Sequence, residues 1–350
     1  MSATPQLPFG RRWEIKILGS QDELGNRDDI IASASSFEPE ALRATFDVCQ
    51  FGYAAWWYGE IVIYNLDGRS RSSSQNALQN TTQKVLTEGT RVVVSAGYQQ
   101  GDHYGVVFDG KIFQAFVERE NVNDYKTILH CVAGKDVVVN NIMAFTLDGN
   151  PSQADVAIQA ATQAPTKLSL QLMEKMGQTT LPRGKTVFSN PSTYFDQLAN
   201  DNKAVWFYDG TKAFMSDFTI PEPDAYVYTP NTGLIGTPIQ TQDGVQFRVL
   251  LDPRLRVKLN PVQVKLDMTS MIFLKAQIDQ LPSPLDMNGV YVVGAVRHFG
   301  DTRGDAWYTD VTGYTTVGGR LGMLGATASS SQAEAQQAAA WAAKQNVNQK

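Results

Sequence analysis

The chain has 350 residues, of which 43% are hydrophobic and 19% charged, and its formal net charge is −5 at pH 7. This length favours two or three domains, and the apolar content is sufficient for packed cores. An acidic chain without a run of Lys and Arg interleaved with aromatic residues argues against nucleic acid as the main partner. No apolar stretch reaches about 18 residues and no secretory signal is present, so we expect a soluble protein made in a cytoplasm.

The first part of the chain shows the alternation of apolar and polar residues that is typical of half-buried strands. An aromatic cluster, Trp56-Trp57-Tyr58, lies between two of these strands, and Gly89 follows a run of helix-forming residues. Glycine just past the last periodic residue is a common helix stop. The pattern predicts three strands and one helix, at residues 13–18, 44–48, 60–64 and 76–86.

Residues 91–136 consist of short β-branched and aromatic runs separated by Gly, Asp and Asn, which predicts a small antiparallel sheet. Asp109-Gly110 is the sharpest turn signal, because a two-residue hairpin turn needs positive φ and Asp-Gly adopts it at low cost. We therefore expect a hairpin turn at Asp109-Gly110. Residues 136–147 continue with apolar runs that are compatible with closing the same barrel or sandwich.

The character changes at Pro151, where Ala-rich and Gln-rich sequence with helical spacing begins. Pro191 suits the first turn of a helix, and Asp209-Gly210 separates two aromatic runs as a hairpin turn would. Residues 151–217 are therefore predicted to form a small inserted α+β domain. Its helices are expected at 154–164, 168–176 and 191–200, and its hairpin strands at 204–208 and 212–215.

The last part of the chain follows a Pro-rich linker at residues 220–224. The apolar pattern predicts strands at 244–251, 262–266, 289–298 and 306–312. From residue 326 onward the sequence is rich in Ala, Gln and Ser, which predicts a weak helix or a disordered tail.

Two segments of the chain resemble each other in the order of their features. Each contains an apolar strand, a strand led by Gly, a polar turn with Asp and a strand led by an aromatic residue. The first series is 92–94, 110–117 and 123–128, and the second is 262–264, 289–296 and 304–311. This pattern favours an internal duplication with two similar β-domains, so that three subunits would imitate a ring of six.

No pattern in the sequence indicates catalysis. The three histidines, His103, His130 and His298, have no metal-ligand spacing, and the sequence has no C-x-x-C, nucleophile elbow or phosphate loop. His298 precedes Asp301 by three residues, but we interpret it as a polar residue at a strand end. Carboxylate pairs need no fixed spacing, so Glu118, Glu120 and Asp301 carry no special weight among 35 acidic residues. We predict no catalytic, cofactor-binding or metal-binding residue, and no enzyme activity.

Three smaller features each allow two interpretations. Trp56 and Trp57 either pack in a core or anchor a sugar or protein, since aromatic residues dominate interfaces. The two cysteines, Cys49 and Cys131, lie in apolar runs and favour buried free thiols over a disulfide. Arg303 and Asp305 are expected in a solvated turn, with pairing between subunits as the alternative.

Several phrases, taken in order, resemble baseplate hub proteins of long-tailed bacteriophages. Their order and co-occurrence carry the resemblance, which covers most of residues 13–318 and is strongest after Thr232. The phrases are Thr232-Gly233-Leu234-Ile235-Gly236-Thr237-Pro238, Asp243-Gly244-Val245, Leu250-Leu251-Asp252-Pro253-Arg254-Leu255, Gly289-Val290-Tyr291-Val292-Val293, residues 298–309, and the series Gly97, Gly110, Asn123-Asp124-Tyr125.

The resemblance implies an α+β, mainly β protein that forms a homotrimeric hub. Its fold would comprise two tail-tube-like antiparallel β-barrel domains, 1–150 and 218–325, with the α+β domain 151–217 inserted and a flexible tail at 326–350. Six barrels would match the sixfold tail tube or a distal tail protein on one face and a threefold central spike on the other. A tape measure protein is a further partner that this role allows.

In such a role DNA passes through the channel without specific binding, and the protein is part of the virion baseplate after assembly in the host cytoplasm. The sequence contains no recognisable lysozyme or peptidase segment. Two alternatives stay open: a tail-associated cell-wall hydrolase with carboxylates in the middle domain, and a carbohydrate-binding tail protein that uses Trp56 and Trp57.

Overall fold

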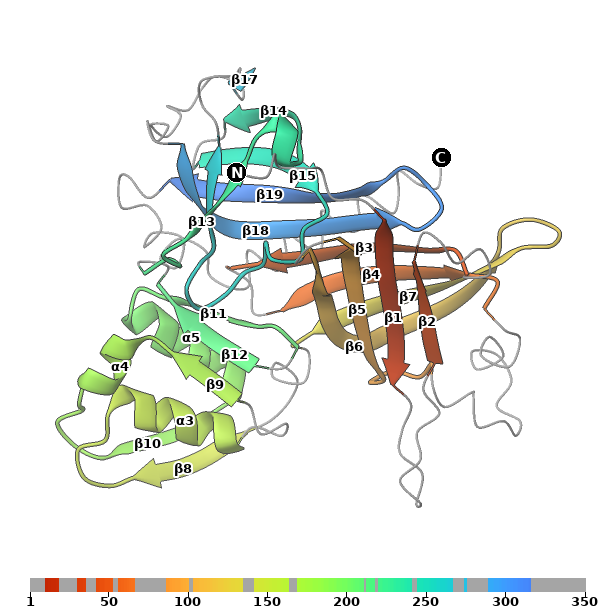
Figure 1. The fold of residues 1–350 in the computed structure, drawn as a ribbon. Helices are drawn as coiled ribbons and strands as arrows, with labels where there is room; N and C mark the ends of the chain where they lie inside the picture. The colour runs from red at the N-terminus through yellow and green to blue at the C-terminus, as the bar shows by residue number, and fades with distance from the viewer. Residues whose placement is uncertain are drawn as a thin grey trace, which may run out of the picture.

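The computed structural model shows a mainly β protein with helices in one module (Figure 1). It describes residues 10–18, 30–35, 42–52, 56–66, 86–100, 103–134, 142–163, 169–210, 212–217, 220–240, 244–266, 274–275 and 289–315. The expected helix at 76–86, except for its last residue, and the expected tail at 326–350 lie outside these residues.

The first strand group contains seven strands. They are β1 (Arg11–Leu18), β2 (Ile30–Ser35), β3 (Ala44–Phe51), β4 (Trp57–Tyr64), β5 (Arg91–Tyr98), β6 (Tyr104–Arg119) and β7 (Tyr125–Ala133). The predicted strands at 13–18, 44–48 and 60–64 are confirmed, and the alternation has the expected cause. On β1, for example, Trp13, Ile15 and Ile17 are buried while the residues between them are more exposed.

The expected hairpin turn at Asp109-Gly110 is wrong. Both residues lie inside the 16-residue strand β6, and the connection between β5 and β6 falls at residues 99–103. Asp109 is held in the strand because its carboxylate accepts two hydrogen bonds from Arg91 on β5. Gly110 is suited to this position because a Cβ there would come within 2.6 Å of the Phe108 ring.

The middle module contains two small sheets and three helices. Its elements are β8 (Met143–Leu147), α3 (Gln153–Gln163), β9 (Ser169–Leu172), α4 (Glu174–Gln178), β10 (Lys185–Ser189), α5 (Pro191–Asp201), β11 (Val205–Tyr208) and β12 (Lys212–Ser216). The two long helices and the hairpin across Asp209-Gly210 are confirmed. Pro191 occupies the first turn of α5, and Asn190 caps that helix by accepting from the Ser192 amide at 2.9 Å.

Two expectations for this part of the chain are wrong. Residues 169–172 form β9, which pairs in parallel with β12, and only the short α4 is helical in the predicted 168–176 segment. Residues 143–147 form β8, which pairs with β10 and does not close the first strand group. In both segments a partner strand that is distant in sequence supplies the backbone hydrogen bonds, and this outweighs the local pattern.

The second strand group ends the described chain. It contains β13 (Ala225–Tyr228), the 3-10 turn η3 (Pro230–Thr232), β14 (Leu234–Gln240), β15 (Gly244–Leu250), β16 (Gln263–Leu266), β17 (Leu274–Lys275), β18 (Val290–Asp301) and β19 (Trp307–Thr315). The four strands predicted in this region are confirmed.

The two strand groups form one continuous sheet of 14 strands, in the order β17-β14-β15-β19-β18-β3-β4-β7-β6-β5-β1-β2, with β13 and β16 branching from β18. The end strands β17 and β2 do not pair with each other, so no closed barrel is found among the described residues. The expectation of two separate barrel domains is therefore not confirmed. The mainly β class is confirmed, and a module of helices and small sheets lies between the two groups in the chain.

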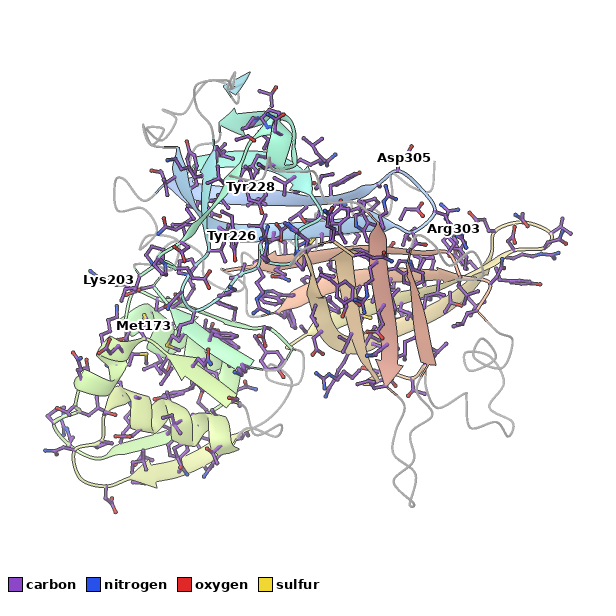
Figure 2. All side chains as sticks on the ribbon, in the orientation of Figure 1. Met173, Lys203, Tyr226, Tyr228, Arg303 and Asp305 are labelled. Carbon is purple, nitrogen blue, oxygen red and sulfur yellow. The ribbon has the colours of Figure 1, made fainter. Side chains whose placement is uncertain are left out.

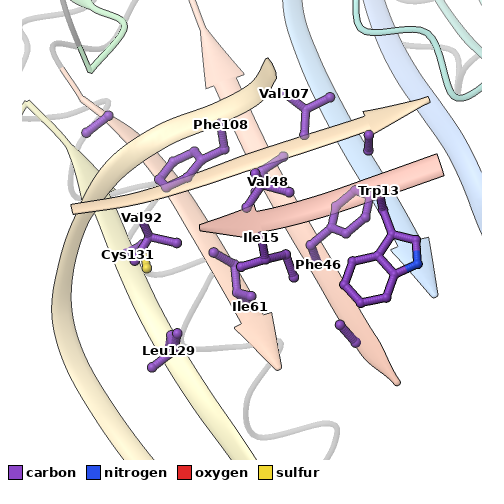
Figure 3. Packing of buried hydrophobic residues seen from close by; sticks show 14 of the residues in the cluster. Trp13, Ile15, Phe46, Val48, Ile61, Val92, Val107, Phe108, Leu129 and Cys131 are labelled. Carbon is purple, nitrogen blue, oxygen red and sulfur yellow. The ribbon is translucent and has the colours of Figure 1, made fainter. Parts of the chain in front are cut away.

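Three buried clusters stabilise these parts. The cluster of the first group contains Phe46, Val48 and Phe108, which pack together with Trp13 and Ile15 in one interior (Figure 3). A second cluster lies within the middle module, and a third lies under the second strand group. No helix among the described residues is long and apolar enough to cross a membrane.

Candidate functional site

The two strand groups meet where β18 pairs with β3. Seven antiparallel residue pairs join these strands, from Ala295 opposite Phe51 to Asp301 opposite Thr45. Across this ladder Arg297 donates two hydrogen bonds to the Asp47 carboxylate, one of them at 2.6 Å, and they raise the pKa of Arg297. The ladder makes the two groups a single sheet at this point.

Arg11, on β1, fastens the turn between β18 and β19 to the first strand group. Its guanidinium donates to the carbonyl oxygens of Asp301, at 3.2 Å, of Gly304, and of Asp305, at 2.9 Å. Arg303 and Asp305 lie at the tip of this turn (Figure 2) and are exposed, as expected for a solvated turn. The alternative, pairing between subunits, stays a prediction.

Trp307, the first residue of β19, packs into the first strand group. Its ring contacts Phe46 edge-on at 5.4 Å, and its Nε1 donates to the Gly97 carbonyl at 3.3 Å. Arg43, which directly precedes β3, and Asp301, the last residue of β18, form an ion pair of 2.8 Å. Aromatic packing and charged hydrogen bonds therefore reinforce the same junction.

The segment that follows β15 crosses back onto the first strand group. Leu251 and Val257 are buried in the first cluster, whereas Leu255 is buried in the third. Gln50 is 2% exposed and connects three segments, because its Nε2 donates to the Val107 carbonyl at 2.8 Å and its Oε1 accepts from the Val257 amide at 3.2 Å. This segment therefore packs against both strand groups.

Asp252 is the centre of a buried polar network in that segment. Tyr228 Oη donates to its carboxylate at 2.7 Å, and Arg254 donates to both carboxylate oxygens, at 2.9 Å from Nε and 2.6 Å from Nη2. Burial alone would raise the pKa of Asp252, but the bonds from Arg254 and His103 outweigh it and hold the pKa well below its usual range. Asp252 is thus an ionised structural carboxylate at neutral pH.

His298 is buried inside β18, three residues before its last residue, so it does not lie at the strand end as we interpreted it. Its Nδ1 lies 2.9 Å from Thr309 Oγ1, and burial lowers the pKa of the ring to about 4. His298 and Asp301 are three residues apart on one strand, so their side chains leave opposite faces of the sheet. The structure does not bring them together as an acid and base pair.

The other two histidines are also part of the packing. His103 Nδ1 lies 3.6 Å from Asp252, and the ring of His130 meets Phe116 edge-on at 5.2 Å. Burial lowers the pKa of His130. Among the described residues, no group of three or more His, Cys, Asp or Glu side chains is arranged to hold a metal ion.

The carboxylates considered in the sequence have structural partners or lie apart. Glu118 pairs with Lys126 at 2.8 Å, and Asp301 pairs with Arg43 and accepts from the Arg303 amide at 2.9 Å. Glu120 lies exposed at the end of β6, where its amide donates to the Asp124 carbonyl. The described structure does not place these three carboxylates around a common site.

Trp57 joins the sheet to the middle module. It is 3% exposed and stacks on Phe207 of β11, with ring centroids 6.0 Å apart, and Phe207 in turn stacks on Phe214 at 5.3 Å. Trp56 is half-buried and lies 6.1 Å from the ring of Tyr58. Core packing is confirmed for Trp57, which also lines the cavity described below.

Both cysteines are free thiols, as predicted. Cys131 is buried, and burial raises the pKa of its thiol, whereas Cys49 is only half-buried. A cavity of about 520 Å³ lies between β6, β12 and the segment 256–260, and Asp109, Lys212 and Lys258 are among its lining residues. None of its described lining residues is a histidine or a cysteine.

The residues that build the junction were mostly not identified from the sequence. Arg11, Gln50 and Asp47 are each far in sequence from the partners that they contact, and no local pattern indicates such pairs. Asp252 and Arg254 belong to a phrase that carried the family resemblance, but that resemblance assigned them no role. The pattern Asp-Pro-Arg directly after a strand was the available signal.

The strand order, with an α+β module between two strand groups, defines a fold that is shared with phage-type tail proteins. The 43 kDa tail protein of prophage MuSo2 from Shewanella oneidensis aligns with a TM-score of 0.53 at 8% identity, over 89% of this chain and 98% of that one. The tail protein from Neisseria meningitidis MC58 aligns with a TM-score of 0.52 at 9% identity, over 88% of this chain and 97% of that one. No protein-family model and no curated protein matches the sequence. At these identities the likeness shows the fold.

Proposed function

We propose that this chain is a structural protein of a phage tail, a baseplate hub that assembles as a homotrimer and has no enzyme activity. The observation that carries the proposal is the junction of two strand groups of matching order within one sheet, in a fold shared with two tail proteins. Two similar units per chain allow three chains to present six similar units in a ring.

The partners follow from this symmetry. One face of the ring would match the sixfold tail tube or a distal tail protein, and the other a threefold central spike, with a tape measure protein as a further partner. DNA would pass through the ring without specific binding, which the net charge of −5 favours because it disfavours tight contact with phosphates. The site of action is the tail baseplate of the virion.

The chemistry of the described residues supports a structural role. His298 bonds to Thr309, His130 packs edge-on against Phe116 with its Nδ1 3.9 Å from Glu60, and the candidate carboxylates Glu118 and Asp301 pair with Lys126 and Arg43. Burial alone would raise the pKa of Asp301, but the hydrogen bonds from Arg43 and the turn amides outweigh it and lower that pKa, which makes Asp301 a poor general acid.

The test is the size and shape of the purified full-length chain. We expect light scattering to give the mass of three chains and negative-stain images to show a ring with a central hole. A chain that stays monomeric at high concentration would contradict the hub. Cleavage of peptidoglycan in a zymogram by the purified chain, but not by a sample unfolded by heat, would contradict the absence of enzyme activity.

A further inference from the structure

The two strand groups agree in pairing order and in register. With β2 and β17 left aside, the strands of the first group pair in the order β1-β5-β6-β7-β4-β3 and those of the second in the order β13-β16-β18-β19-β15-β14. If the strands of each group are numbered along the chain, the two orders are the same. The one difference in direction is that β13 and β16 are parallel, whereas β1 and β5 are antiparallel. Both long strands carry a bulge on the side of the following strand, between Ile112 and Gln114 on β6 and between Val293 and Ala295 on β18. These bulges align Gln114 with Ala295.

The alignment can be followed across four strands of each group. Cα partners run from β3 through β4 and β7 to β6 in the first group, and from β14 through β15 and β19 to β18 in the second. The two rows are Asp47–Glu60–His130–Gln114 and Ile239–Gln246–Thr312–Ala295. The row therefore equates β14 with β3 and Ile239 with Asp47.

One edge of β18 has two partners, and the equivalent edge of β6 has one. The first residues of β18 pair with β16, and beyond the bulge the same edge pairs with β3 over seven residues. On β6 the equivalent edge pairs with β5 up to Lys111, and the Ile112 amide bonds to the Thr90 carbonyl. No strand among the described residues pairs with this edge from Gln114 to Arg119.

The strand equivalent to β3 also has an edge that is largely unoccupied. β14 pairs with β15 on one side, and on the other, within the described part of the chain, only the two-residue strand β17 pairs with it, at Ile239 and Gln240. Ile235 and Ile239 on β14 are 38% and 41% exposed. One chain therefore presents an acceptor edge on β6 in the first strand group and, in the second strand group, the strand β14 that fits it.

We propose that β14 of a second copy of this chain pairs antiparallel with the Gln114–Arg119 edge of β6, repeating between chains the β3–β18 ladder within the chain. In the β3–β18 ladder Phe299 lies opposite Asp47 and His298 lies opposite Val48. The alignment of the two groups makes Glu118 equivalent to Phe299 and Val117 equivalent to His298, and this sets the register of the proposed pairing. It places Glu118 opposite Ile239 and Val117 opposite Gln240. The inference rests on the proposed function for the number of copies, but the pairing itself is independent of that number.

The pairing is head-to-tail, because the two surfaces that meet are different. Such contacts form a ring when the rotation between copies closes and an open filament when it does not. The incoming strand would take the place of β17, whose two residue pairs are few beside the seven of the β3–β18 ladder. Pairing also removes two open strand edges, which otherwise promote aggregation.

Disulfide crosslinking of the full chain tests the register. In a Cys49→Ser background, with the buried Cys131 retained, Glu118→Cys is combined with Ile239→Cys. Directly opposite residues of antiparallel strands have Cα atoms about 5 Å apart, within the range of a disulfide. The matched control combines Glu118→Cys with Gln246→Cys, because Gln246 is the partner of Ile239 one strand further in. In the control the distance between the two Cα atoms is larger by one strand spacing of about 4.8 Å, so it exceeds the limit of about 7 Å for a disulfide.

We expect mild oxidation to shift the Glu118→Cys/Ile239→Cys chain to dimer and trimer masses on a non-reducing gel, and to leave the control at monomer mass. Light scattering and circular dichroism of the reduced variants establish their assembly and folding. A trimer without crosslinks overturns the pairing and leaves the hub intact, and equal crosslinking of both variants overturns the register. Crosslinks in an assembly other than a trimer support the pairing and contradict the hub. A folded, uncrosslinked monomer overturns both proposals.

Discussion

Asp252 is a buried charge that holds together the segment following β15. It is 3% exposed, and Tyr228 and Arg254 satisfy its carboxylate, so its replacement by Asn leaves the Arg254 cation without its partner. We expect Asp252→Asn to lower the free energy of unfolding by about 3 kcal/mol at pH 7, the usual cost of breaking a buried ion pair. Chemical denaturation monitored by tryptophan fluorescence measures this change.

The control for Asp252 is a more exposed pair. Asp310 bonds to Arg248 on the outer face of the second group, and Asp310→Asn is expected to cost less than about 1 kcal/mol. The pH dependence has a definite sign. Because the folded pKa of Asp252 is depressed, its contribution is present above about pH 4 and is lost as the pH falls further. The difference between the wild type and Asp252→Asn should therefore shrink in acid; a constant difference would contradict this account.

His298 predicts a different pH profile. Its pKa is lowered to about 4 in the folded chain because the ring is fully buried, while the unfolded value is about 6.5. The unfolded state therefore takes up the proton first, and stability is lost as the pH falls from about 6.5 to about 4, by about 3 kcal/mol in total.

His298→Gln cannot titrate, so it should lose this part of the pH dependence while keeping a polar group near Thr309. Unfolding by urea at several pH values between 7 and 4.5 compares the two proteins. We expect a smaller decline for His298→Gln than for the wild type. Parallel declines would mean that other groups, such as His130, cause the acid sensitivity.

At the scale of elements, Gly97 determines how β5 turns into β6. Its φ is +152°, and a Cβ at this position would lie 1.8 Å from the His103 carbonyl oxygen, which is backbone and cannot rotate away. We expect Gly97→Ala to destabilise the chain by about 2–4 kcal/mol, through strain and displacement of the hairpin. Thermal unfolding followed by circular dichroism measures the loss.

Gly177 provides the matched substitution. It lies in α4, and apart from its chain neighbours and the helix backbone no described atom lies within 4 Å of the place that an alanine Cβ would take. Gly177→Ala should therefore be neutral or stabilising by up to about 1 kcal/mol. If both alanine variants unfolded at the same temperature, the close contact between a Cβ at residue 97 and the His103 carbonyl oxygen would not affect stability, and this account would be wrong.

At the scale of the whole molecule, Trp57 couples the middle module to the sheet. Its ring stacks on Phe207, and removal of this buried ring should cost about 3–5 kcal/mol. We expect Trp57→Ala also to let a protease separate the module from the sheet under conditions in which the wild type stays whole. Limited proteolysis with mass spectrometry of the fragments reports this.

Phe188 is the control for this coupling, since it is an aromatic residue of the module that is 75% exposed. Phe188→Ala should change the free energy of unfolding by less than about 0.5 kcal/mol and leave the cleavage pattern unchanged. Separation of the module in Phe188→Ala but not in Trp57→Ala would contradict the proposed role of Trp57.

Local patterns predicted most strands and the two long helices because burial alternates along a half-buried strand and follows the turns of a helix. The alternation of Trp13, Ile15 and Ile17 is such a pattern, and so is the capped start of α5 at Pro191. The same reasoning failed at Asp109-Gly110 and at residues 169–172. There the conformation depends on a partner strand that no local window contains.

The sequence by itself determined the mainly β class, the α+β module between two strand-rich parts and the partial repeat of strand features, because these depend on local periodicity and turn chemistry. Only the tertiary structure decided that the two parts form one sheet through β3 and β18, and that Arg11, Gln50 and Asp252 hold the junction. The physical reason is that the β3–β18 pairing and the hydrogen bonds of Arg11 and Gln50 join residues hundreds of positions apart. Their complementarity exists only once the chain has folded.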